Sequence, residues 1–481
     1  MTNNEKVEIM PSFTQACLIF LLIVGIILYA TVVLKVSPHI PMFVCLVLTI
    51  LLGLYLKYPW EEMQEALFKG IHIGLLPMLI MILIGMVIGS WIACGTIPYI
   101  IYLGIKFFSP QWFLVSVLLI CSIMSLSTGS SWTTIGTLGV AFMAIGYGLG
   151  ISPAITAGAV VSGAVFGDKQ SPLSETTNFA PAVAETTLFN HVRSMLYSTT
   201  PAYIIALIIY SFIGLRYAGK AVDTEKITLM ANTLQGAFNF NQILLLLPIF
   251  LIALVVKKVP ALLGMGSAAL LGLVFAIIFQ RAELSDLINY MHYGYVGNTG
   301  VEVVDKLISK GGLNSMMWTI SLMFFALSMG GVLERIGVLK VILNKLSNIV
   351  SSVFGLITTT LFSVLALEFV TADSYLPMLL SGRTFGPAFD RLHIDRKVLS
   401  RSLEDTGTLG SFWVPWSESG VFVLATLGVS AFDYLPYYFL GTITPLVSMV
   451  LAATGFGIWY TNKKENTKKI ITDKSENTAQ S

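Results

Sequence analysis

The chain has 481 residues, of which 55% are hydrophobic and only 11% are charged, and its net charge at pH 7 is +2. Soluble domains usually have about 25% charged residues, so this composition excludes an ordinary soluble fold. The four cysteines lie far apart in apolar stretches without a CxxC pair, which argues against a disulfide framework or a metal cluster.

Long uncharged runs predict an all-α polytopic membrane protein. A spanning helix needs about 20 mostly apolar residues, and the alternation over about ten residues that marks a membrane β-barrel is absent. In chain order, crossings are predicted at 13–34, 40–56, 74–97, 159–190 (interrupted), 194–216, 240–256, 261–279, 313–334, 402–430 (interrupted) and 434–460. Broken helix pairs or re-entrant hairpins are predicted at 112–146 and 352–382.

These elements divide the chain into two transmembrane repeats with polar flanks. The predicted segments are a cytoplasmic N-terminal segment (1–12), a first repeat (13–216), an inter-repeat loop (217–239), a second repeat (240–460) and a basic cytoplasmic tail (461–481). Placing both termini inside puts 19 of the 28 Lys and Arg residues on the inner side, as the positive-inside rule requires. We therefore predict a multi-pass inner-membrane protein with both termini on the cytoplasmic side.

The two halves contain related sequences, which predicts an internal repeat. At one offset of 243 residues, TGSSW (128–132) aligns with TADSY (371–375) and GDKQSPLSE (167–175) aligns with GSFWVPWSE (410–418). The loop near 140–158 has no charge, whereas its counterpart at 383–401 has five basic residues, so equivalent loops are expected to face opposite sides. Inverted repeats of this kind are common in secondary transporters that bind substrate near the membrane midplane.

In the first half, a dense group of oxygen donors lies in GDKQSPLSETTNFAP (167–181), where Gly and Pro predict an interrupted helix. Intramembrane carboxylates usually face a cavity and serve function, and hard cations prefer oxygen ligands. The candidate ion and proton ligands are Asp168, Ser171, Ser174, Glu175, Thr176, Thr177 and Asn178. Sodium coordination is assigned to Asp168, Ser174, Glu175 and Thr176, while Lys169 is either a counter-charge or a residue reaching the interface.

In the second half, the candidate ion and proton ligands are Asp373, Asp405 and Glu418, each flanked by Ser, Thr or Gly. An alternative pairs Asp405 and Glu404 with Arg401 at the inner boundary. Glu368, which could cap the break before TADSY or face the pathway, is not assigned to the site. Because protons and sodium ions can compete for one desolvated carboxylate, such a site predicts antiport.

The motif at 167–181 resembles the signature of the bacterial NhaC-type sodium/proton antiporters, GDKxSPLS(D/E)TTN followed by AP. The resemblance extends over nearly the whole chain and implies exchange of cytoplasmic sodium for external protons. Many members have Asp at the position of Glu175, and a close branch exchanges malate for lactate. By position, the resemblance carries over Asp168, Ser171, Ser174, Glu175, Thr176 and Thr177, whereas residues of the second half carry over less directly.

Other function classes fit less well. No HExxH, GxSxG or GxGD motif occurs, so no enzyme and no cofactor are predicted, and internal repeats do not match the ring-forming filter of a channel. An organic-acid exchanger that uses arginines near 383–401 stays an open alternative. The predicted partners are Na⁺, H⁺ and the lipid bilayer, with Li⁺, malate or lactate as alternative substrates. A homodimer is a candidate assembly, and no nucleic acid is expected to bind.

Overall fold

The computed structural model describes residues 10–217, 224–257 and 259–461. These residues form helices, with one isolated β-bridge between Ile394 and Tyr460, so the predicted all-α membrane fold is confirmed. Within these ranges, seven helices are long and apolar enough to cross a membrane, or up to nine if each of two strongly bent pairs is one span. The sequence predicted ten crossings, and three further apolar helices are shorter than the others.

The first half contains ten α-helices and two π-helical segments within the described residues. Its elements are α1 (Phe13–Leu28), η1 (Tyr29–Val33), α2 (His39–Tyr55), α3 (Trp60–Ala93), α4 (Thr96–Phe107), α5 (Pro110–Thr128), α6 (Ser131–Thr134), η2 (Ile135–Gly139), α7 (Val140–Gly148), α8 (Pro153–Gln170), α9 (Glu175–Val183) and α10 (Leu188–Leu215). The span predicted to start at residue 74 is wrong at its beginning, because α3 starts at Trp60. Glu61 and Glu62 lie in its first turn, where acidic side chains favour a helix rather than a loop.

The rest of the described chain is equally helical. Its elements are α11 (Thr224–Ala237), η3 (Gln242–Leu245), α12 (Leu246–Val256), α13 (Ala261–Phe275), η4 (Ala276–Gln280), α14 (Leu284–Tyr293), α15 (Glu302–Ile308), α16 (Leu313–Arg335), α17 (Val338–Ile349), α18 (Val353–Thr371), α19 (Tyr375–Arg391), α20 (Arg396–Gly410), α21 (Glu418–Leu427), α22 (Ala431–Tyr434), η5 (Leu435–Tyr437) and α23 (Phe439–Thr454). Helix α11 lies inside the stretch that the sequence assigned to an inter-repeat loop. Nearly all of the predicted N-terminal segment and the basic tail lie outside the described residues.

Helix boundaries recur at the offset that the sequence indicated. Helices α5 and α18 begin 243 residues apart, at Pro110 and Val353, and so do α8 and α20, at Pro153 and Arg396. Helices α9 and α21 follow the same spacing. The two halves therefore repeat one order of elements, while their opposite orientation in the membrane stays a prediction.

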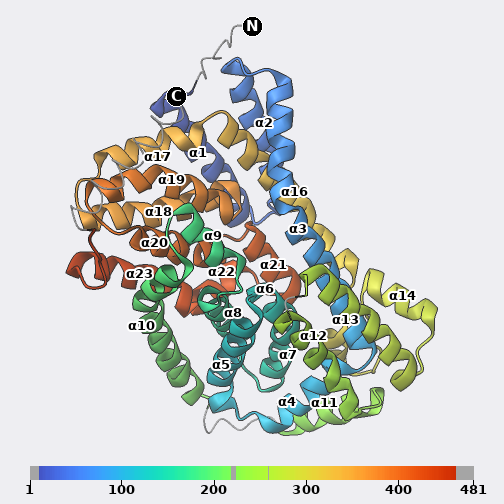
Figure 1. Ribbon diagram of the computed structural model, residues 1–481. Helices are drawn as coiled ribbons and strands as arrows, with labels where there is room; N and C mark the ends of the chain where they lie inside the picture. Colours follow the sequence, from blue (N-terminus) through green and yellow to red (C-terminus); the bar gives the residue numbers. More distant parts are fainter. Residues whose placement is uncertain (1–9, 218–223, 258, 462–481) are drawn as a thin grey trace.

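The halves meet along α3 and α16, which run side by side through the molecule (Figure 1). At Gly70 an added Cβ would lie 2.1 Å from the Leu327 carbonyl oxygen, and at Gly331 it would lie 2.2 Å from the Ala66 carbonyl oxygen. Only glycine allows the two backbones to approach this closely, as at other small-residue crossings in membranes. This crossing fixes the two halves beside each other.

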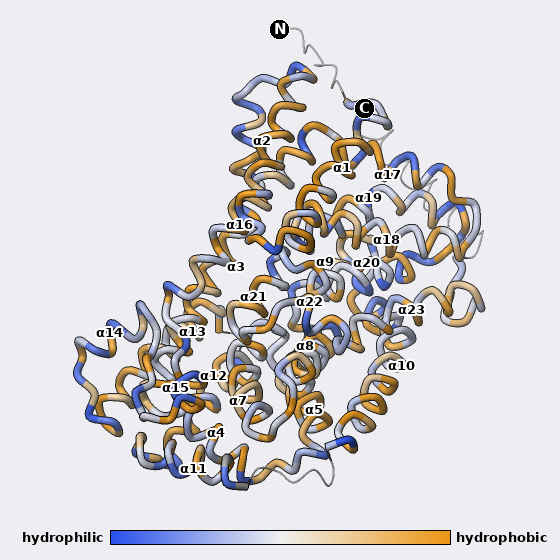
Figure 2. The backbone as a smooth tube through the Cα atoms, turned by 180° about the vertical axis from the view of Figure 1, so that it is seen from behind, coloured by the Kyte–Doolittle hydropathy of each residue, from blue (hydrophilic) through white to orange (hydrophobic). Residues whose placement is uncertain are grey.

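The outer surface suits a membrane. Figure 2 shows hydrophobic residues along most helices, with strongly hydrophilic residues at many loops and helix ends. Large apolar side chains are exposed, among them Leu21, Phe107 and Phe212. Soluble proteins rarely expose so many large apolar side chains together, whereas in lipid they are solvated by the acyl chains.

Candidate functional site

Four helix interruptions surround one cavity of about 370 Å³. They separate α5 from α6, α8 from α9, α18 from α19, and α20 from α21, so each half contributes two. Gly129 and Ala372 end α5 and α18 in the left-handed conformation, with φ of 67° and 54°. At Gly129 an added Cβ would lie 2.7 Å from the Leu173 carbonyl carbon, so the first two breaks touch each other and require a glycine there.

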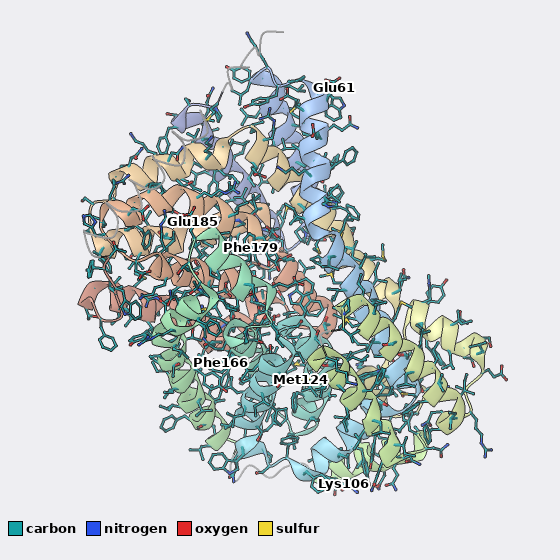
Figure 3. The ribbon with its side chains drawn as sticks, viewed as in Figure 1. Glu61, Lys106, Met124, Phe166, Phe179 and Glu185 are labelled. Atoms are coloured by element: carbon teal, nitrogen blue, oxygen red, sulfur yellow. The ribbon has the colours of Figure 1, made fainter. Side chains whose placement is uncertain are left out.

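The cavity lies between the ends of the molecule. Phe166 on α8 and Phe179 on α9 lie on either side of the second break in the chain (Figure 3). In the same view, both are found between Glu61, near one end of the molecule, and Lys106, near the other (Figure 3). The break between α8 and α9 is therefore remote from both ends.

The cavity wall is acidic and rich in hydroxyl groups. Among the described residues that line it, Asp168, Glu175 and Glu418 are carboxylates and none is Lys, Arg or His. Hydroxyl groups come from Thr128, Ser130, Ser131, Thr133, Ser174, Thr176, Ser374, Tyr375, Thr408, Ser411 and Ser419. Such a wall offers hard oxygen ligands to a cation and no positive partner to an anion.

Asp168 joins the two breaks of the first half. It is buried, and its Oδ2 accepts hydrogen bonds from the Ser131 backbone N–H at 3.2 Å and from the Ser131 hydroxyl at 2.6 Å. The Thr177 hydroxyl donates to the main-chain carbonyl oxygen of Asp168 at 3.2 Å. Ser131 therefore fixes the carboxylate at the cavity, and Thr177 fixes the backbone that carries it.

The second half repeats this pattern with Glu418. Its Oε1 accepts a hydrogen bond from the Ser374 hydroxyl at 2.9 Å, and its backbone N–H donates to the Ala372 carbonyl oxygen at 3.0 Å. Ser374 follows Ser131 by 243 residues, but the carboxylates are not at equivalent positions, because Asp168 aligns with Ser411 and Glu418 with Glu175. Each half thus presents one serine-bound carboxylate from a different point of its break.

The four predicted sodium ligands, Asp168, Ser174, Glu175 and Thr176, all line the cavity. The hydroxyls of Ser174 and Thr176 lie 3.2 Å apart. Glu175 is exposed within the cavity, and the Tyr375 hydroxyl of the other half donates to its Oε2 at 3.1 Å. The described residues contain no group of three or more His, Cys, Asp or Glu side chains suited to a metal ion, so hydroxyl oxygens would have to complete a sodium shell.

Four other predicted ligands do not line the cavity and instead bond within the breaks. The Ser171 hydroxyl donates to the Leu126 carbonyl oxygen at 2.8 Å, and the Asn178 amide donates to the Ser174 carbonyl oxygen at 2.7 Å. Thr177 caps the end of α8 as described above. Asp373 accepts from the Leu376 backbone N–H at 2.6 Å, which is helix-capping chemistry.

Lys169 and Asp405 form a buried ion pair that joins the halves. Both side chains are fully buried, and Asp405 also accepts hydrogen bonds from Ser198, at 3.0 Å, and Ser448. Neither residue lines the cavity. The alternative that Lys169 reaches the interface is wrong, because its side chain is fully buried and pairs with Asp405. The alternative that Arg401 pairs with Asp405 is also wrong, because the Arg401 guanidinium donates to the Gly457 carbonyl oxygen at 2.9 Å.

Sequence reasoning did not select Ser131, Ser374 and Tyr375, which carry no net charge. The alignment of TGSSW with TADSY contained the signal, because both serines are identical at the shared offset. The sequence analysis also left Glu368 unassigned. In the structure this side chain is fully buried, and neither carboxylate oxygen has a hydrogen-bond partner among the described residues.

Comparison with known proteins places this architecture among transporters. The sequence profile of the Na⁺/H⁺ antiporter family matches residues 4–168 and 163–456. The Na⁺/H⁺ antiporter NhaC of Alkalihalophilus pseudofirmus is 42% identical over 90% of this chain and 94% of its own length. The malate-2H⁺/Na⁺-lactate antiporter of Bacillus subtilis is 37% identical over 96% and 98% of the two chains. The arginine/ornithine antiporter ArcD of Halobacterium salinarum is 35% identical over 95% of each.

Proposed function

The chain belongs to the Na⁺/H⁺ antiporter family, and from that premise we propose that it exchanges cytoplasmic Na⁺ for external H⁺ through the carboxylates of the helix-break cavity. The meeting of four helix breaks around an acidic cavity carries this proposal. Interrupted helices expose backbone carbonyls and hydroxyls that can replace the hydration shell of an ion.

In this proposal Asp168, Ser174, Glu175 and Thr176 bind sodium, and Glu418 takes part in proton binding. A carboxylate in such a cavity is costly to ionise without a cation, so it takes either a proton or a sodium ion. Because the two ions compete, sodium leaves toward one side only as protons replace it. Ser131 and Ser374 orient the carboxylates, while Ser171, Thr177, Asn178 and Asp373 stabilise the breaks.

Alternating access would come from rocking of two inverted repeats. The ion pair of Lys169 with Asp405 and the glycine crossing of α3 with α16 connect the halves that would move. We place the protein in the bacterial inner membrane with both termini cytoplasmic, on the basis of the distribution of Lys and Arg. Cysteines introduced one at a time at Lys57 and Lys306, in a variant whose four native cysteines are replaced by serine, test this topology with a membrane-impermeant maleimide. Only Lys306→Cys should react from outside.

Proteoliposomes that contain a pH-sensitive dye test the exchange. A proton gradient is imposed, and its collapse is recorded on addition of sodium, lithium, potassium, malate or lactate. We expect collapse with sodium for the wild type and none for Asp168→Asn. If sodium did not collapse the proton gradient in proteoliposomes with correctly inserted wild-type protein, the proposal would be refuted.

The second candidate is an organic-acid exchanger, favoured by the 37% identity to the malate-2H⁺/Na⁺-lactate antiporter. A dicarboxylate needs positive partners, and the described cavity wall has no Lys, Arg or His. Sodium therefore fits the cavity better. Collapse of the gradient only when malate or lactate is present would reverse this preference.

A further inference from the structure

Glu368 lies in the last turn of α18, one turn before the break at Ala372. Its side chain is fully buried, and both Oε1 and Oε2 lack a hydrogen-bond partner among the described residues. A polar group buried without a partner is costly, and an ionised one is far more so. Its environment therefore favours a neutral, protonated carboxyl group whenever no cation is near.

Glu368 lies directly behind the cavity wall. At Gly410 an added Cβ would lie 2.4 Å from Glu368 Oε2, and the next residue, Ser411, lines the cavity. The absence of a side chain at position 410 creates the space that the carboxyl group fills. A group in this position can respond to an ion in the cavity without touching it.

The first half has the same contact but a different side chain. Gly167 precedes Gly410 by 243 residues, and an added Cβ there would lie 2.7 Å from the Ser125 Cβ. Ser125 is in turn the counterpart of Glu368. The repeat therefore conserves the packing of a glycine against the end of a helix, while the second half alone places an acid in that space.

In the described parts of the chain, the charged groups that act most strongly on Glu368 are acids. Asp373 and Glu418 act on it electrostatically and are both acidic, and the Tyr438 hydroxyl is also buried near it without a partner among the described residues. Glu334 of α16 adds a further acid near Asp373.

Three arginines on helices that pack against α18 bond to other groups. Arg335 pairs with Glu62, Arg391 donates to the Ser347 carbonyl oxygen, and Arg401 donates to the Gly457 carbonyl oxygen. On α20, Glu404 accepts from the Thr408 hydroxyl and Asp405 pairs with Lys169, while α1 has no charged residue. Glu368, Asp373 and Glu418 are thus in no ion pair within the part of the chain that the structure describes.

We propose that Glu368 is a second proton-binding carboxylate of the exchanger, separate from the sodium ligands, and that it releases its proton when sodium enters the cavity. Sodium beside Glu418 brings a positive charge that no ion pair of the described residues supplies to Glu368, Asp373 or Glu418, so one more carboxyl group can ionise. The O–H bond of Glu368 breaks, and the proton leaves through the cavity as the carboxylate remains. This inference rests on the proposed function.

The test is the pH dependence of sodium binding to the purified full-length protein, measured with ²²Na⁺ at equilibrium over about pH 6 to 9. Because sodium binding that releases protons becomes tighter as pH rises, linkage makes the slope of log Kd against pH equal to minus the number of protons released. We expect Glu368→Gln to bind sodium with a slope smaller in magnitude by about one. The exposed control Glu302→Gln should keep the wild-type slope. A wild-type slope in Glu368→Gln would overturn the inference.

Infrared difference spectra keep the inference testable should Glu368→Gln fail to fold. Adding sodium to the wild type should remove a protonated carboxylic acid band, and Glu368→Asp, which retains the acid, should shift part of it. An unshifted band, or no loss of acid signal in the wild type, would refute a proton on Glu368. Failure of the wild type to bind sodium at all would instead refute the proposed function, so the two failures are distinguishable.

Discussion

The helix break after α8 and the break after α20 occupy equivalent places in the two halves, yet they hold charge in different ways. Near the first, Asp168 accepts two hydrogen bonds from Ser131, and the adjacent Lys169 pairs with Asp405. Near the second, Glu368, Asp373 and Glu418 form no ion pair among the described residues. The backbone of both halves forms the cavity in the same way, but the carboxylates near the two breaks have different partners.

The largest expected effect comes from removing one member of the buried ion pair. Lys169→Met leaves Asp405 charged and unpaired, which should cost about 3–5 kcal/mol of stability. The double variant Lys169→Met/Asp405→Leu should recover most of that loss, because neither charge of the pair remains. Thermal unfolding in detergent measures both. Equal instability of the single and double variants would show that the pair has no such role.

Loss of the Asp168 charge is the next largest effect and tests the first wall directly. Asp168→Asn should weaken sodium binding about 100-fold, the equivalent of about 3 kcal/mol. Glu418→Gln should weaken sodium binding less but alter its pH dependence. ²²Na⁺ binding distinguishes these outcomes, and equal losses of affinity in both variants would remove the contrast between the walls.

Replacing the cavity serine of the first half, Ser131, should lower sodium affinity more than replacing that of the second half, Ser374. Ser131→Ala removes a hydrogen bond to a charged carboxylate and should reduce sodium affinity by about 1.5–3 kcal/mol. Ser374→Ala removes a bond to a carboxyl group that is protonated for part of the cycle, so we expect about 0.5–1.5 kcal/mol. Sodium titrations of the two variants in parallel give the comparison, and a larger loss in Ser374→Ala would invert it.

The smallest effect lies outside the membrane-spanning part, at the exposed pair of Lys306 and Glu302. The hydrogen bond from Lys306, together with its charge, lowers the pKa of Glu302. Lys306→Met should raise that pKa toward its ordinary value, as an NMR titration would show. The pairing stabilises the protein while Glu302 is ionised, and this stabilisation is lost as pH falls through the lowered pKa of Glu302. The stability of the variant should therefore differ from that of the wild type at neutral pH and not in acid. Transport should be unchanged.

Much of the architecture follows from the sequence alone. Apolar runs far longer than a soluble core needs predict spanning helices, and Gly and Pro at 167–181 predict the break between α8 and α9. The offset of 243 residues predicts where α18 to α21 repeat α5 to α9. Local chemistry suffices for these features, because solvation by lipid and backbone conformation depend on neighbouring residues.

Which donors share a cavity, and which only cap a helix, was decided by the tertiary structure. The sequence presents Asp168, Asp373 and Asp405 all as candidate ion and proton ligands, with Asp168 also assigned to sodium. Folding places the first at the cavity, the second in a helix cap and the third in an ion pair with Lys169. Glu368 is buried, without a hydrogen-bond partner in the described chain, only because Gly410, from another helix, leaves room for it. Partners distant in the chain set these roles, since a carboxylate's charge is stabilised by whatever surrounds it in space and not by its neighbours in sequence.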